Sequence, residues 1–237
     1  MTKKRLILLT LFGLASLLLC ALFYWFAPFV LDQRTNTFRQ WGSGNEATRA
    51  ALITVPADTC GDAPFMLPSA GFIGLLYDDP RPPYSRTQPH QGIDIFSDTI
   101  PGATPVFAAY DGYISREDHW RSALIQRVPQ DPLQPERQIW LYYTHMADEA
   151  GNSFIIDAIP PGTREFFVEQ GTLIGYTGNY NGNSARSIWV HLHFSIVRDD
   201  GSGRYLNELD IANTLDPTPY LGLDVEYDTA VVPVACP

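Results

Sequence analysis

The chain has 237 residues, of which 45% are hydrophobic and 18% are charged, a composition typical of a globular protein rather than a disordered one. Its formal net charge is -10, and all three basic residues of the first 31 positions precede the first apolar run. From Asp32 onward, 13 arginines stand against 26 acidic residues, a formal -13. An acidic body of this kind gains nothing from counterion release on phosphates, so we expect no nucleic-acid partner.

The N-terminal segment 6–31 contains no charged residue over 26 positions. About 20 apolar helical residues suffice to cross a bilayer, and a cleaved signal peptide has a shorter apolar core. We therefore predict that residues 1–31 form a cytoplasmic tip and an uncleaved transmembrane signal anchor; the alternative is a cleaved signal peptide. Lys3, Lys4 and Arg5 predict a single-pass protein of the cell membrane with a cytoplasmic N-terminus and an extracytoplasmic body.

Residues 32–59 are polar and are predicted to form a stalk, partly helical over 46–53. Residues 60–237 then form the body. Cys60 and Cys236 bracket this body and could close a disulfide in an oxidising compartment, the alternative being two unpaired thiols. Cys20 lies within the apolar run, where it is expected to act as a small hydrophobic residue.

Short β-like runs separated by turn residues dominate the body, and no segment there has a long helical period. The sequence therefore predicts a mainly β fold, an antiparallel sheet or sandwich-like domain. A hairpin is expected where 105–110 runs through Asp111-Gly112 into 113–115. Further strands are expected over 137–145, 171–178 and 188–197.

Two segments, 116–136 and 146–165, are predicted to be loops inserted between strands. Each could form a wall of a groove, because connections run over the surface and are where binding residues concentrate.

Four of the five histidines fall into three short clusters. His90 and Asp94 are spaced i, i+4, His145 ends an aromatic strand, and His191 and His193 form a His-x-His pair whose side chains share one face of a strand. A catalytic Zn²⁺ takes three protein ligands and a water, which two histidines and one aspartate would satisfy. The two remaining histidines could then bind the water and the developing oxyanion.

Each cluster alone has an ordinary explanation, because a buried histidine is usually a hydrogen-bonded core residue. His119 lies in a predicted loop and is expected to be an exposed surface residue. It is the order of the clusters in one β-rich domain that is specific.

In that order the chain resembles the LytM/lysostaphin-type zinc metallopeptidases, the M23 peptidase family, over roughly 90–197 and at most 60–220. The resemblance implies that His90, Asp94 and His193 are the zinc ligands. It also implies that His145 and His191 are the two catalytic histidines that do not bind the metal.

Other positions extend or limit this resemblance. Tyr84 resembles a tyrosine that some members use near the oxyanion, and three glycines at 171, 175 and 178 match the turn region before the His-x-His strand. Asp216-Pro217 resembles the family's closing segment. The chain departs from the family over 183–190, and Ser195 stands where many members carry glutamate.

The resemblance implies a membrane-anchored zinc metalloendopeptidase that hydrolyses peptide bonds in bacterial peptidoglycan cross-links. Its partners would be peptidoglycan peptides, the membrane and a possible envelope protein activator. The alternative is a non-catalytic docking or regulatory domain for another envelope protein or wall hydrolase. A zinc enzyme acting on a peptide outside the wall is a third option, because fold and site do not fix the substrate.

Overall fold

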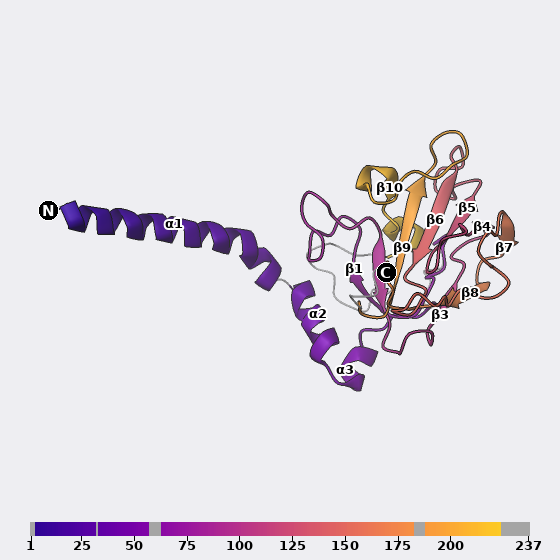
Figure 1. Ribbon diagram of the computed structural model, residues 1–237, viewed down its shortest axis with the longest axis horizontal. Coiled ribbons are helices and arrows are strands. Elements are labelled where there is room, and N and C mark those ends of the chain that lie inside the picture. Colours follow the sequence, from indigo (N-terminus) through magenta and orange to yellow (C-terminus); the bar gives the residue numbers. More distant parts are fainter. Residues whose placement is uncertain (1–2, 32, 57–62, 183–187, 224–237) are drawn as a thin grey trace.

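A computed structural model describes residues 3–31, 33–56, 63–182 and 188–223 (Figure 1). Cys60 and Cys236, for which a disulfide was predicted, lie outside these residues. The helices and strands, in chain order, are α1 (Lys3–Leu31), α2 (Gln33–Ser43), α3 (Glu46–Ala50), β1 (Phe72–Leu75), β2 (Ile93–Phe96), β3 (Pro105–Phe107), β4 (Gly112–Ser115), β5 (Leu124–Val128), β6 (Ile139–Thr144), β7 (Phe166–Val168), β8 (Leu173–Tyr176), β9 (His191–Arg198), η2 (Ile211–Asn213), β10 (Thr214–Leu215) and α4 (Thr218–Leu221).

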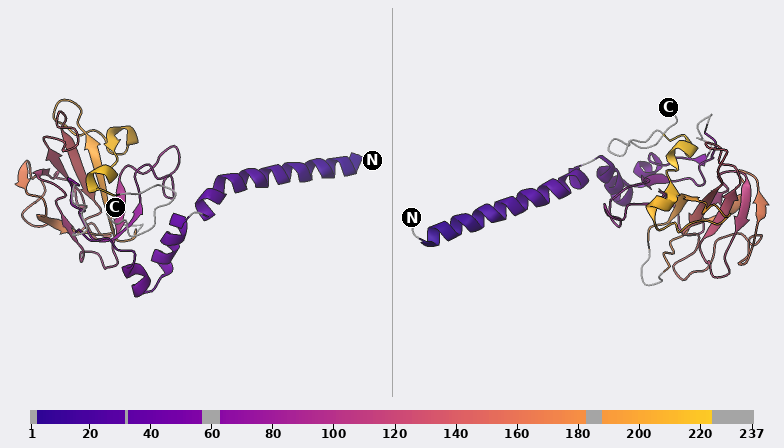
Figure 2. Two further views of the ribbon diagram at one scale, coloured as in Figure 1. Left: turned by 180° about the vertical axis from the view of Figure 1, so that it is seen from behind. Right: turned by 90° about the horizontal axis from the view of Figure 1, so that it is seen from above.

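The predicted antiparallel β fold is confirmed. One eight-stranded sheet runs in the order β1-β2-β9-β6-β5-β4-β7, with β10 beside β9, and every pairing in it is antiparallel. A second, two-stranded sheet pairs β3 with β8. Figure 2 shows the long strands of the main sheet lying side by side in the body, with α1 projecting away from them.

Alternation along the strands divides the main sheet into two faces. Leu192, Phe194 and Ile196 of β9 point into the main hydrophobic core, together with the alternate residues Ile93 and Ile95 of β2. The residues between them point to the other face. On β9 those intervening residues include His191 and His193, so the period of the strand places both histidines away from the core.

The predicted hairpin over 105–115 is wrong, although both of its strands exist. β3 pairs with β8, whereas β4 pairs with β5 and β7. The turn signal at Asp111-Gly112 is local, and longer-range pairing places the two strands in different sheets. The first predicted loop, 116–136, also contains β5, whose core-facing residues Leu124 and Val128 are buried.

The predicted stalk is helical over α2 and α3, and part of it packs against the body. Trp41 of α2 and Leu52 are buried with Phe72, Leu75 and Phe96 of the first two strands. Helix α3 begins where the side chain of Asn45 accepts a hydrogen bond from the Thr48 amide, a regular N-cap.

Residues 6–31, predicted to span a membrane, lie within α1. Within the described part of the chain, no helix has the length and apolar character that crossing a membrane requires.

Candidate metal centre

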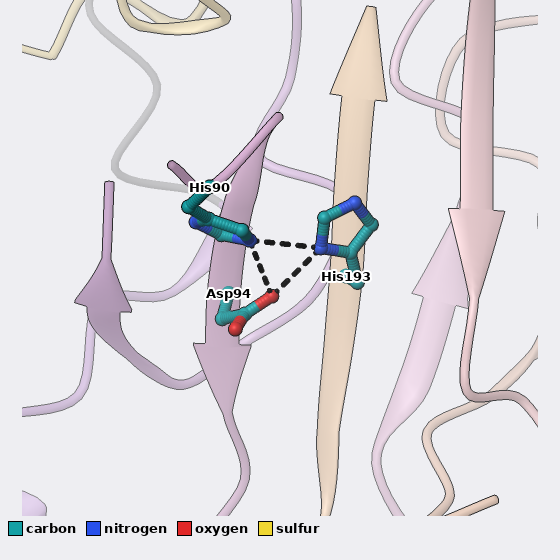
Figure 3. A group of neighbouring side chains, drawn as sticks. All are labelled: His90, Asp94 and His193. Atoms are coloured by element: carbon teal, nitrogen blue, oxygen red, sulfur yellow. Dashed lines mark hydrogen bonds and ion pairs between the residues drawn. The ribbon is translucent and has the colours of Figure 1, made fainter. Parts of the chain in front are cut away.

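The structure brings together the three predicted ligands at the pairing of β2 with β9. Asp94 of β2 lies directly across from His193 of β9, and His90 reaches the same point from the segment that leads into β2 (Figure 3). All three side chains are buried. Antiparallel register and an i, i+4 spacing therefore place side chains that are 103 positions apart within contact distance.

The ligand atoms of these residues converge. His90 Nε2 lies 2.9 Å from His193 Nδ1, and Asp94 Oδ1 lies 3.1 Å from the first nitrogen and 2.9 Å from the second. The three atoms fall within 4.8 Å of one another, as a shared metal ion requires. Two imidazoles and one carboxylate, with no thiolate, are a donor set that suits zinc and leaves a coordination position open.

Outer contacts fix the orientation of both imidazoles. The Leu76 carbonyl accepts a hydrogen bond from His90 Nδ1 at 2.9 Å, and the Glu208 carboxylate accepts one from His193 Nε2 at 2.8 Å. In these tautomers the inward nitrogens, His90 Nε2 and His193 Nδ1, carry the lone pairs that a metal needs.

The electrostatics keep the carboxylate ionised. Burial opposes the charge of Asp94, but the neighbouring His90, His191 and His193 hold its pKa well below the ordinary value. Burial likewise opposes a charge on His193, yet hydrogen bonds to Asp94 and Glu208 raise its pKa to about 10 in the metal-free chain. A cation is therefore favoured at this point, whether it is a proton on His193 or a metal ion.

The two predicted catalytic histidines lie beside this centre. Their ring centroids are 4.4 Å apart, and His191 Nε2 lies 3.8 Å from Asp94 Oδ1. His145 Nδ1 donates to the Tyr180 carbonyl at 2.6 Å, and His191 Nδ1 donates to the Trp189 carbonyl at 2.7 Å. Both Nε2 atoms are thereby left free to accept a proton.

Burial keeps both of these imidazoles neutral. It lowers the pKa of His145 to about 3, with help from His191 and His193, and it lowers the pKa of His191 as well. His145 also has a φ of 72°, a left-handed backbone that a residue with a Cβ adopts at a cost and that is frequent at functional sites.

A glycine permits this backbone to pass close to its neighbour. A Cβ at Gly178 would lie 2.5 Å from the His145 carbonyl oxygen and 2.0 Å from that of Ala147. The glycine predicted at this position is therefore needed for close approach of the chain.

The ring of Tyr84 packs against that of His90, with centroids 4.5 Å apart and planes inclined by 35°. Burial, followed by Asp94 and Glu208, raises its pKa above the ordinary range, so its hydroxyl remains protonated at neutral pH. Its predicted role at an oxyanion stays a prediction.

A groove of about 790 Å³ opens over the centre and is lined by His145, His193, Tyr84 and Glu208. Residues 119–123 of the first predicted loop also line it, as expected. The second predicted loop, 146–165, is not among its lining residues. His119 is exposed as predicted, although it lines the groove.

Glu208 is the residue of the site that the sequence did not identify. It lies between β9 and η2 in an acidic segment with no characteristic spacing to any histidine. Burial opposes its charge, but the hydrogen bond to His193 and the positive charge on that ring lower its pKa. Ser195 follows His193 on the same face of β9, so the position that departs from the family pattern adjoins Glu208.

No family model and no curated protein matches the chain. Solved structures do. The catalytic domain of lysostaphin from Staphylococcus simulans is 20% identical, over 56% of this chain and 79% of its own, with a TM-score of 0.36. A putative glycyl-glycine endopeptidase LytM from Ruminococcus gnavus is 19% identical, over 78% of this chain and 68% of its own, with a TM-score of 0.42.

Helicobacter pylori Csd3 is 18% identical over 66% of this chain, with a TM-score of 0.40, and the chain covers 33% of its length. Lysostaphin and LytM are the proteins after which the family resembled by the sequence motifs is named. These overlaps are partial, with TM-scores below 0.5, so what the centre can do depends on the geometry of its own side chains.

Proposed function

We propose that the chain is a zinc-dependent endopeptidase that hydrolyses peptide bonds in bacterial peptidoglycan cross-links. The supporting observation is that the four histidines around Asp94, three of them buried and His145 partly buried, form two pairs with different roles. Two present ring nitrogens to a common point with the carboxylate, and two others keep a free Nε2 beside it. A docking domain has no need of the second pair.

His90, Asp94 and His193 would hold the ion. Zinc bound there would act as a Lewis acid and make water acidic enough to ionise near neutral pH. His145 and His191 are neutral at that pH because burial lowers the pKa of each, so either Nε2 can take a proton from water and return it to the leaving amine.

Tyr84 keeps its proton at neutral pH and can donate a hydrogen bond to a negatively charged oxygen in the groove. The groove also presents Trp120 and Tyr142, flat apolar surfaces along which an extended peptide can lie. The assignment of peptidoglycan as the substrate draws on the family resemblance of the motifs.

The proposal predicts separable effects of two substitutions in the full chain. His193→Ala should abolish stoichiometric zinc, because one of three ligands is lost. His145→Ala should retain zinc but lower the release of soluble fragments from purified peptidoglycan about 10²- to 10⁴-fold, the usual contribution of a general base. Glu149→Gln, which changes an exposed side chain that does not line the groove, is the control and should retain both properties.

Zinc in the wild type without any cleavage of peptidoglycan would contradict the proposed enzyme. It would favour the alternative, a domain that docks onto another envelope protein. Absence of zinc from the wild type would contradict the metal centre itself.

We also propose an extracytoplasmic body attached to the cell membrane by residues 6–31. This proposal rests on the sequence alone, on the uncharged run and the basic residues before it. Protease added to intact spheroplasts should digest the body but spare the N-terminus, and protection of the body would contradict it.

A further inference from the structure

Helix α2 packs on the face of the main sheet that carries the metal centre. Phe38 of α2 makes edge contacts with Phe72 of β1 at 5.3 Å and Phe96 of β2 at 5.6 Å between ring centroids. Trp41, one helical turn further along, lies 5.3 Å from Phe72 and is 5% exposed. These contacts fix the position of α2 on β1 and β2.

Phe96 contacts both α2 and the predicted catalytic histidine His191. It is the cross-strand partner of His191, and the two rings are stacked with centroids 5.0 Å apart and planes inclined by 28°. One side of Phe96 therefore contacts α2 and another supports the imidazole of His191.

A second contact reaches His191 through its hydrogen bond. A Cβ added to Gly42 of α2 would lie 3.0 Å from the Trp189 indole, so the helix and this ring leave little room for a side chain between them. Trp189 contacts Phe96 edge-on at 5.9 Å, and its carbonyl accepts the hydrogen bond that selects the tautomer of His191. Helix α2 thus packs against both residues that orient His191, namely Phe96 and Trp189.

A third contact reaches the segment that carries a predicted metal ligand. Arg34 of α2 donates to the Gly74 carbonyl and lies 3.8 Å from the buried carboxylate of Asp79. The Asp79 carbonyl in turn accepts a hydrogen bond from the backbone amide of His90 at 3.0 Å.

We propose that α2 is a positioning element of the active site, which holds the His191 imidazole in place through Phe96 and Trp189. The segment expected from its polarity to be a stalk would then be part of the catalytic unit. This inference rests on the proposed function for its kinetic consequence, but the position of the imidazole can be measured without any activity.

Substitutions at two positions in the full chain test it. Phe38→Ala removes the ring that supports Phe96, and Phe38→Leu restores most of its volume. Gly42→Ala pushes on the Trp189 indole while raising the helix propensity of α2, so it separates positioning from folding. Phe167→Ala on β7 is the control, because that ring is 51% exposed and contacts Tyr113 on an edge of the sheet remote from the site.

The first measurement is the set of histidine side-chain resonances in an NMR spectrum of the zinc-loaded protein. Phe38→Ala and Gly42→Ala should shift the His191 ring signals and leave those of exposed His119 in place. Zinc stoichiometry should remain that of the wild type, because no ligand is changed.

On peptidoglycan fragments, kcat should fall about 10- to 100-fold for Phe38→Ala and roughly threefold for Gly42→Ala, with KM little changed, since small displacements of a catalytic group are costly. Phe38→Leu should recover most of both properties.

Unchanged His191 signals in folded Phe38→Ala and Gly42→Ala would overturn the inference. Shifted His191 signals in a protein that cleaves nothing would support the positioning role and count against the proposed function instead.

Discussion

Replacing Glu208 by glutamine tests whether a residue outside the ligand set supports the metal. The Glu208 carboxylate accepts a hydrogen bond from His193 Nε2 at 2.8 Å, in surroundings where its side chain is 16% exposed. Glutamine can still accept that bond but carries no charge, and a charged acceptor makes a bond about twice as strong as a neutral one. Loss of an outer-shell partner of this kind typically weakens metal binding by about 10- to 100-fold.

We therefore expect about a 10-fold loss of zinc affinity for Glu208→Gln, or about 1.4 kcal/mol, and a larger loss for Glu208→Ala. A second effect works in the opposite direction. Glu208 also raises the pKa of His193, to about 10 in the metal-free chain, so zinc must displace a proton at neutral pH. Because the substitution weakens the binding of this proton too, the loss of affinity should be smaller at pH 6.5 than at pH 9.

The assay is a chelator-competition titration of zinc at both pH values. Glu149→Gln, which removes the same charge from an exposed position, is the control. Equal zinc affinity of Glu208→Gln and the wild type at both pH values would refute the argument that this carboxylate supports the metal through His193, because the proton on His193 offsets the loss to different extents at the two pH values.

Three further predictions concern stability and substrate. Tyr143→Phe should lower the free energy of unfolding by about 1–3 kcal/mol in a denaturant titration, because it leaves buried Gln126 without the hydroxyl that donates to it at 2.8 Å; an unchanged midpoint would contradict this. The metal-free chain should be most stable near pH 6.5. Below that value stability falls, because the unfolded chain binds a proton at His145 whereas the folded chain, in which the pKa of His145 is lowered to about 3, does not. Above it stability also falls, because the folded chain holds a proton on His193, whose pKa is raised to about 10, and this preference is lost as the pH approaches that value. Denaturation curves that show stability still rising from pH 7 to 9 would be inconsistent with this. Arg121 is the one arginine or lysine among the described residues that line the groove. Arg121→Gln should therefore weaken the binding of peptides that carry a free carboxylate roughly threefold. Competition titrations should show unchanged binding of the same peptides with that carboxylate amidated.

Local periodicity made much of the centre predictable. A strand repeats every two residues, so the pair His191 and His193 had to share a face, opposite the apolar residues between and after them. The spacing of His90 and Asp94 likewise placed both at one end of a strand. What these patterns predict depends only on neighbours a few positions apart, and the ligand atoms of His90, Asp94 and His193 do lie within 4.8 Å of one another.

Turn signals were less informative, because they do not specify the partner of a strand. Asp111-Gly112 favours a hairpin, but β3 and β4 each find better partners elsewhere in the chain. Residues 116–136 were predicted to be a loop, but Leu124–Val128 within them forms β5, which pairs with β4 and β6.

The sequence by itself determined the strand character of the body, the face on which each histidine lies and the donor types of the centre, since all three follow from residue type and short spacing. Only the tertiary structure decided that Glu208 orients His193, that Leu76 orients His90 and that α2 packs behind Phe96. Each of these contacts joins segments that no short repeat in the sequence relates to one another. Their approach is set by the packing of the whole sheet.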